Sequence, residues 1–310
     1  MMRRKRFGAM LLMLLGLSLC ACGTHQSGAA GTGSAAPGGN QTAPSTETAA
    51  VTDIQTEPGT ESDTLPGEDP AMRAVPGKKT IRNLLLTALE PVGSTMYVWG
   101  GGWNESDDGA GIEAVTIGVS PAWRAFYLEQ DASYDFDKTR YRIHDGLDCS
   151  GYVGWVVYNV MHTESGGDGY VTSSTAMADM LADRGFGDSL PRGRVTDLQP
   201  GDIMSMKGHV WIAVGVCKDG SCVLLHSSPA GVSLCGTKTP DGSDGSEAIR
   251  LAERYMQREY PDWYAKFPNC TRDASYFNAS RFRWNRQTLS DPDGMLSMDA
   301  AEVLKSLFGS

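Results

Sequence analysis

Apolar and polar positions divide this chain of 310 residues into three parts. Residues 7–19 are mostly apolar, whereas residues 23–77 hold few large apolar side chains and no aromatic one. From residue 78 onward, apolar positions recur with the spacings of helices and strands. The pattern therefore predicts one folded domain over residues 78–310, preceded by two segments that do not join its core.

Helices and strands can be placed within the domain by their periodicity and end signals. Helices are predicted over 80–90, 148–161, 174–184, 246–259 and 299–308. Strands are predicted over 203–206, 210–216, 223–226 and 281–284. Helices that flank a strand-rich middle indicate an α+β domain with an antiparallel sheet.

The N-terminus has the features of an export signal. Four basic residues, 3–6, precede the apolar run, which is too short to span a bilayer. The sequence Leu19-Cys20-Ala21-Cys22-Gly23 resembles a bacterial lipobox, which makes residues 1–22 a lipoprotein signal peptide and Cys22 the lipidated residue. The alternative is an ordinary secretory signal cut near Ala21. Both alternatives predict an exported protein, and the first anchors it to the membrane through lipid.

Residues 23–77 are rich in Gly, Ser, Thr, Pro and Ala and carry an excess of acid. Such a segment cannot bury enough surface to offset the entropy of ordering. We expect a disordered tether that holds the domain away from the membrane.

Charge and ligand patterns limit the partners. The chain has a net charge of −10, and no basic stripe with interleaved aromatic residues occurs, so we expect no binding to nucleic acid. Cysteines and histidines lack paired ligand spacing, so we expect no metal. We also expect no cofactor and a monomeric protein.

The tetrapeptide Asp148-Cys149-Ser150-Gly151 carries the most specific chemistry. Asp148 is a suitable N-cap for the apolar helix that follows, and a cysteine at its first position faces unpaired N–H groups that favour a thiolate. His209 and His226 occur in strand-like runs further along, and cysteine with histidine is the pattern of an activated nucleophile. The alternative is a buried structural cysteine with two surface histidines.

Five blocks in this order resemble the NlpC-type cell-wall cysteine peptidases, which are papain-like enzymes of bacterial peptidoglycan. They are Tyr97-Val98-Trp99-Gly100-Gly101, Leu147-Asp148-Cys149-Ser150-Gly151-Tyr152-Val153, Leu198-Gln199-Pro200-Gly201-Asp202-Ile203, His209-Val210-Trp211-Ile212-Ala213-Val214-Gly215 and Leu225-His226-Ser227-Ser228. The resemblance implies a papain-like fold in which the catalytic cysteine begins a helix packed on an antiparallel sheet that carries the histidines.

The resemblance also implies catalytic roles. Cys149 would be the nucleophile, His209 the general base, and His226 the residue that orients His209. A thiolate attacks an amide carbonyl while an imidazole transfers the proton, which agrees with these roles. A backbone N–H at the start of the cysteine helix would stabilise the oxyanion. The alternative for His226 is a half-buried strand residue with no catalytic part.

The substrate would contact positions around the nucleophile. Tyr97 matches a family position beside the substrate, and Asp148 and Ser150 match positions that hold the free amine of a stem peptide in several members. Trp211 stands where the family has a small residue, so it either narrows the cleft or packs.

Two long segments lie outside the five matched blocks. We expect residues 102–147 to form an insertion near the active site, and its many aromatic residues predict a folded cap or cleft wall. The alternative is a surface excursion with its own small apolar cluster. Residues 236–310 form a C-terminal extension.

The hairpin between the two histidines poses a problem of register. Asp219-Gly220 favours a two-residue turn, which would place Cys217 opposite Cys222 and His226 opposite Ala213. Direct pairing of the two histidines differs from this register by four residues, roughly 13 Å at strand rise. A bulge or a looser loop must absorb the difference if the triad forms.

Four cysteines remain once Cys20, Cys22 and Cys149 are assigned. In an oxidising compartment, we expect disulfides Cys217–Cys222 and Cys235–Cys270. The alternative is four reduced, buried thiols.

Taken with the resemblance, these residues indicate an exported, lipid-anchored cysteine endopeptidase that faces the cell wall and cuts peptidoglycan stem peptides. The resemblance implies the bond between γ-D-glutamate and a diamino acid. The alternatives are an amidase or acyltransferase on the same fold, or a non-catalytic wall-binding module whose cleft is blocked by the insertion.

Overall fold

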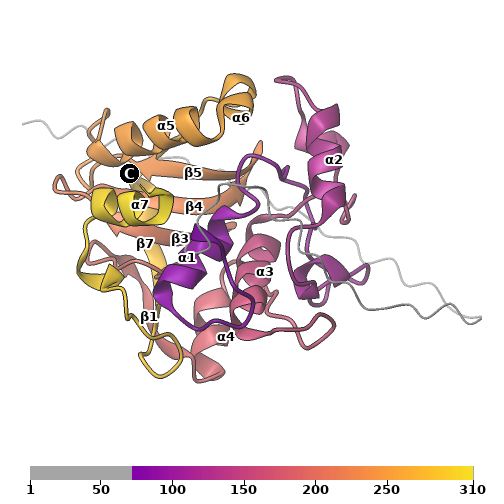
Figure 1. Cartoon of the computed structure of the whole chain (residues 1–310), viewed down its shortest axis with the longest axis horizontal. Helices are drawn as coiled ribbons and strands as arrows, with labels where there is room; N and C mark the ends of the chain where they lie inside the picture. The colour runs from indigo at the N-terminus through magenta and orange to yellow at the C-terminus, as the bar shows by residue number, and fades with distance from the viewer. Residues whose placement is uncertain (1–71, 310) are drawn as a thin grey trace, which may run out of the picture. The chain divides into compact units, whose positions relative to one another are not determined.

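The computed structural model describes residues 72–309, which form an α+β arrangement of seven α-helices and one seven-stranded sheet (Figure 1). The α+β class is therefore confirmed. The signal peptide, Cys22 and the tether up to residue 71 lie outside the described residues. Within residues 72–309, no helix has both the length and the apolar character needed to cross a membrane.

The sheet has the order β1-β7-β2-β3-β4-β5-β6. Its strands are β1 (Gly187–Arg194), β2 (Ile203–Met206), β3 (His209–Val216), β4 (Cys222–Ser228), β5 (Gly231–Thr237), β6 (Thr271–Arg272) and β7 (Asn278–Trp284). Every neighbouring pair is antiparallel except β5 and β6. The prediction of a wholly antiparallel sheet is wrong at this edge, because the chain passes through two helices between β5 and β6 and so re-enters parallel.

The helices are α1 (Ile81–Leu89), α2 (Pro121–Glu129), α3 (Cys149–Met161), α4 (Met177–Asp183), α5 (Glu247–Glu259), α6 (Pro261–Lys266) and α7 (Ala300–Phe308). The five predicted helices are confirmed. Their starts follow the expected capping chemistry: the side chain of Thr80 accepts from Asn83 N–H, and α7 begins with a full capping box. The two unpredicted helices, α2 and α6, both begin with proline.

Helices α5 and α7 pack against one face of the sheet. Gly236 of β5 lies so close to α5 that a Cβ there would come within 2.2 Å of the Ala248 backbone. A Cβ on Gly215 of β3 would likewise come within 2.9 Å of the Ala300 backbone in α7. Both glycines pair with Val223, so they share a face, and His226, three residues further along β4, points to the opposite face.

The β3–β4 hairpin differs from the predicted tight turn. Cys217 N–H donates to the carbonyl of Ser221, and Gly220 has a φ of +79°, so the loop has three residues and ends in a left-handed glycine. The prediction that Cys217 faces Cys222 is therefore wrong, since Cys222 pairs with Val216. A bulge between Ala213 and Gly215 shifts the register again.

The sequence predicted neither β1 nor β5. Strand β1 is an edge strand with mostly exposed residues and a proline, which hides its periodicity. Strand β5 is buried along its whole length, but two glycines, a serine and a threonine among its seven residues leave too short an apolar pattern to mark a strand.

The insertion and the C-terminal extension both contribute to the folded unit. In the insertion, α2 is anchored by Trp123, whose ring packs edge-on at 5.7 Å against Trp155 of α3, and by Tyr127, which stacks on Trp263 of α6. The extension supplies β7, which lies between β1 and β2 in the sheet. It is thus part of the central architecture.

Candidate active site

Cys149 is the first residue of α3 and its side chain is buried, with 7% exposed. The side chain of Asp148 accepts from Gly151 N–H at 2.7 Å, which starts the helix at the cysteine as the sequence predicted. The backbone N–H of Val210, at the beginning of β3, faces the Cys149 sulfur. The nucleophile candidate therefore lies against the strand that carries His209.

The two predicted histidines are brought together. Nε2 of His209 and Nδ1 of His226 lie 2.8 Å apart, with the two rings edge to face. His209 is half-buried and His226 is fully buried. The regular pairing of β3 and β4 ends at Ile212 and Leu225, and its continuation would place His226 level with Trp211.

The contact between the two imidazoles therefore spans a register offset of two residues between β3 and β4. The looser loop and the bulge together remove half of the four-residue offset that a tight turn would give. The imidazole rings bridge the rest because both lie on the same face of the sheet. The looser loop and the bulge both occur as expected, but they do not place His209 directly opposite His226, and the register that placed His226 opposite Ala213 is wrong.

Two residues of the C-terminal extension join this site. Nε of Arg272 donates to Nε2 of His226 at 3.1 Å. The ring of Tyr276 lies 5.4 Å from that of His209 and 6.1 Å from that of His226. The sequence analysis predicted neither residue. The position of Arg272, two residues after the expected disulfide cysteine Cys270, is a signal that could have indicated it, whereas no local motif marks Tyr276.

Burial governs the protonation of Cys149 and His209. It raises the pKa of the Cys149 thiol to about 12, an effect that the charge of Asp148 increases and backbone N–H groups oppose. Burial also holds the pKa of His209 well below its usual value, helped by His226 and Arg272. Burial therefore favours the neutral forms of both side chains and opposes the thiolate that the helix start favours.

The predicted amine-binding residues are connected to the insertion. The Ser150 hydroxyl donates to Oδ1 of Asp148 at 2.8 Å and accepts from the indole N–H of Trp103 at 3.0 Å. Ser150 is buried, and burial raises the pKa of Asp148 to about 6 against the hydrogen bonds from Gly151 and Ser150. Asp148 is half-buried and is therefore the more accessible of the two residues.

Tyr97 lies next to Cys149 and is covered by the insertion. Burial, and then the neighbouring Cys149, raise the pKa of its phenol. Its backbone carbonyl accepts from the hydroxyl of Tyr134 at 2.6 Å, and its ring meets that of Phe136 edge-on at 5.4 Å. The insertion therefore covers the position predicted to contact substrate.

Trp211 is fully buried on β3, and its ring lies 6.1 Å from that of Tyr276. Its indole nitrogen is buried without a hydrogen-bond partner. Trp211 was expected either to narrow the cleft or to pack, and in the structure it packs.

The four cysteines expected to form disulfides are free, buried thiols in the structure, as is Cys149. For Cys217 and Cys222, the reason is the three-residue loop, which removes them from opposite positions. Cys235 lies on β5, and Cys270 directly precedes β6, the strand that pairs with β5, so the two thiols are close enough to interact. The reduced alternative is the arrangement found.

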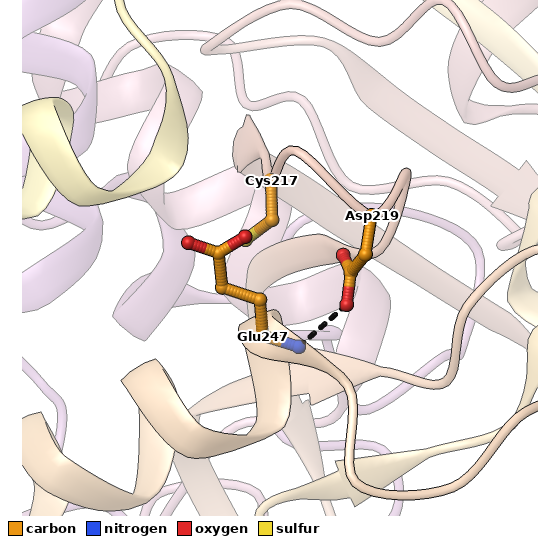
Figure 2. Close-up of side chains that lie close together, drawn as sticks. All are labelled: Cys217, Asp219 and Glu247. Atoms are coloured by element: carbon orange, nitrogen blue, oxygen red, sulfur yellow. Dashed lines mark hydrogen bonds between the residues drawn. The ribbon is translucent and has the colours of Figure 1, made fainter.

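A separate group of potential metal ligands lies at the β3–β4 turn. Figure 2 shows Cys217, Asp219 and Glu247 side by side, with their ligand atoms within 4.8 Å of one another. The carboxylate of Asp219 accepts from the Glu247 N–H at 2.7 Å, and that of Glu247 accepts from the Lys218 N–H at 3.2 Å. These bonds connect the hairpin to the start of α5, so the cluster has a structural role.

Comparisons with known proteins return no relative: no protein-family model, no curated protein and no solved structure matches the chain.

Proposed function

We propose that the chain is a cysteine endopeptidase with a papain-like fold of the NlpC type, which hydrolyses peptide bonds in peptidoglycan stem peptides. The observation that carries the proposal is the contact between His209 and His226 next to the helix that begins at Cys149. A nucleophile, a base and an orienting group are the parts that amide hydrolysis by a thiol requires.

The reaction would begin with proton transfer. Because His209 is neutral at rest, it takes the Cys149 proton as the sulfur attacks the carbonyl, and the bond between sulfur and carbon forms. Backbone N–H groups of the first turn of α3, which have no partner within the helix, face the developing oxyanion. Protonated His209 then gives its proton to the leaving amine, and water hydrolyses the thioester.

The substrate class follows from the sequence resemblance and the amine site. Asp148 offers a carboxylate beside the nucleophile, suited to the free amine of a stem peptide. The bond between γ-D-glutamate and the diamino acid is the one that the resemblance implies. The lipid anchor at Cys22 would place the enzyme outside the membrane, facing the cell wall.

The test is digestion of purified muropeptides by the purified chain, with products weighed by mass spectrometry. We expect the wild type to release a diamino-acid-containing peptide, and Cys149→Ala to be inactive. The matched control is Cys222→Ala, which removes another buried thiol and should remain active.

Other outcomes would identify the alternative functions. Transfer of an acyl group to an added amine would indicate an acyltransferase, and cleavage at the amide that joins glycan to peptide would indicate an amidase. Binding of muropeptides without turnover would support a non-catalytic wall-binding module. Intact muropeptides, with no binding, would overturn the proposal.

A further inference from the structure

The chain between β6 and β7 has to cross the sheet. Strand β6 lies at one edge, whereas β7 lies between β1 and β2, with β5, β4, β3 and β2 in between. The connection, residues 273–277, is a single turn of 3₁₀ helix, and the side chain of Asp273 caps its start by accepting from Ser275 N–H at 3.0 Å. So short a connection brings its side chains close to the strands that it crosses.

Tyr276 is the residue of this connection that lies on the two histidines. The centroid of its ring is 5.4 Å from that of His209 and 6.1 Å from that of His226. The ring also lies 6.1 Å from that of Trp211, which is fully buried on β3. Aromatic rings attract one another at centroid separations of about 4.5–7 Å. Tyr276 therefore packs on both members of the histidine pair at once.

The backbone on either side of Tyr276 is held in place. Phe277 is fully buried, and its carbonyl accepts from the N–H of Val195 at 2.9 Å. Strand β7 begins directly afterwards and pairs with β1 and β2. Before the connection, Arg272 is held by the pairing of β6 with β5. The position of the Tyr276 ring is therefore set by the sheet on both sides.

A single hydrogen bond holds an imidazole loosely. Nε2 of His209 and Nδ1 of His226 lie 2.8 Å apart, but a hydrogen bond tolerates variation in its angle, so this contact alone lets the His209 ring tilt. A tilt would move Nδ1 of His209, the nitrogen that takes the proton of Cys149 in the proposed reaction. The ring of Tyr276 is inclined at 60° to that of His209, and close packing at this distance opposes the tilt.

We propose that Tyr276 is a positioning residue for the reaction: its ring holds the imidazole of His209 toward Cys149 and shields the hydrogen bond between His209 and His226 from water. The inference rests on the proposed peptidase function. Exclusion of water strengthens a hydrogen bond between buried groups. The ring has this role and the hydroxyl does not, because the contacts with both imidazoles are made by the ring.

The test compares Tyr276→Leu, which keeps apolar volume but removes the ring, with Tyr276→Phe, which keeps the ring but removes the hydroxyl. Tyr276→Met is a second variant without a ring, for use if the leucine variant folds poorly. The first measurement is kcat and KM for muropeptides. We expect Tyr276→Leu to lower kcat by about tenfold, the factor that corresponds to the loss of an aromatic pair, with KM within about twofold. Tyr276→Phe should keep kcat within about twofold of the wild type.

The second measurement follows the hydrogen bond itself and needs no activity. In protein that carries isotope-labelled histidine, the imidazole N–H between His209 and His226 gives an NMR signal if it exchanges slowly with water. The signal is assigned by its absence from His226→Ala. It should persist in Tyr276→Phe and should broaden or disappear in Tyr276→Leu, because water then reaches the histidine pair.

The control is Tyr255→Leu on α5. Tyr255 is buried and packs on Phe308 at 5.0 Å, within the helices that cover the other face of the sheet. This variant also removes a tyrosine ring from a packed aromatic pair, so it should unfold at a lower urea concentration while kcat and the NMR signal remain those of the wild type. A loss of kcat in Tyr276→Leu that Tyr255→Leu does not share is therefore no consequence of lowered stability.

The two measurements separate the two proposals. A wild-type kcat in Tyr276→Leu would overturn the role of Tyr276 and leave the proposed function intact. Equal losses of kcat in Tyr276→Leu and Tyr276→Phe would also overturn it, because the hydroxyl would then have the role assigned to the ring. If the wild type cuts no muropeptide, the proposed function fails, and an NMR signal unchanged in Tyr276→Leu would show that Tyr276 does not protect the histidine pair either.

Discussion

Trp103 donates its indole N–H to the Ser150 hydroxyl at 3.0 Å, which connects the insertion to the residue beside Cys149. Ser150 uses its only hydrogen on Oδ1 of Asp148. Ser150 is therefore occupied from both sides, and Asp148 is the group with the charge to bind an ammonium. In the proposed peptidase, recognition of a free amine would therefore depend mainly on one carboxylate.

Asp148→Asn should weaken the binding of stem peptides with a free amine, because the charge is lost while the amide oxygen can still cap α3. We expect KM to rise by about tenfold, as for the loss of a charge-assisted hydrogen bond, with little change in kcat. N-acetylated peptides provide the control, since their affinity should not respond. Equal KM values for both peptides in the wild type would contradict this role.

The same carboxylate predicts a pH dependence. The pKa of Asp148 is raised by burial to about 6, so the charge that attracts the amine is present above pH 6 and is lost as the pH falls through that value. For free-amine peptides, KM should therefore rise below pH 6, and this rise should be absent in Asp148→Asn. A KM that is constant from pH 5 to pH 8 in the wild type would count against it.

If the proposed roles hold, His226 should contribute less to turnover than His209, because it would orient the base without being the base itself. We expect His209→Ala to lower kcat by about 10³-fold or more and His226→Ala by roughly 10- to 100-fold. His226→Asn or Gln should recover part of the loss by restoring a partner for His209. Equal losses in His209→Ala and His226→Ala would show that the two roles are not distinct.

The elements of the core were predictable because single residues mark their starts. Asp148 defines the start of α3, and the capping box of Asp299 and Glu302 defines that of α7. Strand β6 could not be foreseen, since it has two residues and is held by pairing with β5. Pairing across a sheet depends on distant residues, which periodicity along one segment does not report.

The residues of the site were likewise predictable where a local motif marks them and unpredictable where distant strand pairing places them. Cys149, His209 and His226 were found by motif, and the structure brings the two histidines into contact. Arg272 could not be found, because its partner is 46 residues away and only the parallel pairing of β6 places it behind His226. The register of the hairpin was mispredicted because Asp219-Gly220 suits a two-residue turn and a three-residue loop equally well.

The protonation state of Cys149 can be measured directly. Since burial raises the pKa of its thiol to about 12, alkylation at pH 7 should be slow and should accelerate by nearly tenfold per pH unit above neutrality. The labelled peptide is identified by mass spectrometry, and denatured protein gives the rate for an exposed thiol. Labelling that is equally fast at pH 6 and pH 9 would instead indicate a preformed thiolate–imidazolium pair.

The anchor prediction concerns Cys22, which lies outside the described residues. Cys22→Ser should move the protein from the membrane fraction to a soluble exported or uncleaved form, because lipid on this residue is the predicted attachment. The measurement is fractionation followed by mass analysis of the mature N-terminus. A wild-type N-terminus at any residue other than Cys22 would favour an ordinary secretory signal.

Stability of the insertion should depend on the buried face of α2. Trp123 is fully buried and its ring packs on Trp155, so Trp123→Ala should lower the free energy of unfolding by about 3–5 kcal/mol. Leu128, on the same helix but 62% exposed, is the matched control, and Leu128→Ala should change the free energy of unfolding by less than about 0.5 kcal/mol. Urea titration measures both changes. If Trp123→Ala unfolds at the wild-type urea concentration, α2 is not anchored to α3 as described, and the insertion is a surface excursion with its own cluster.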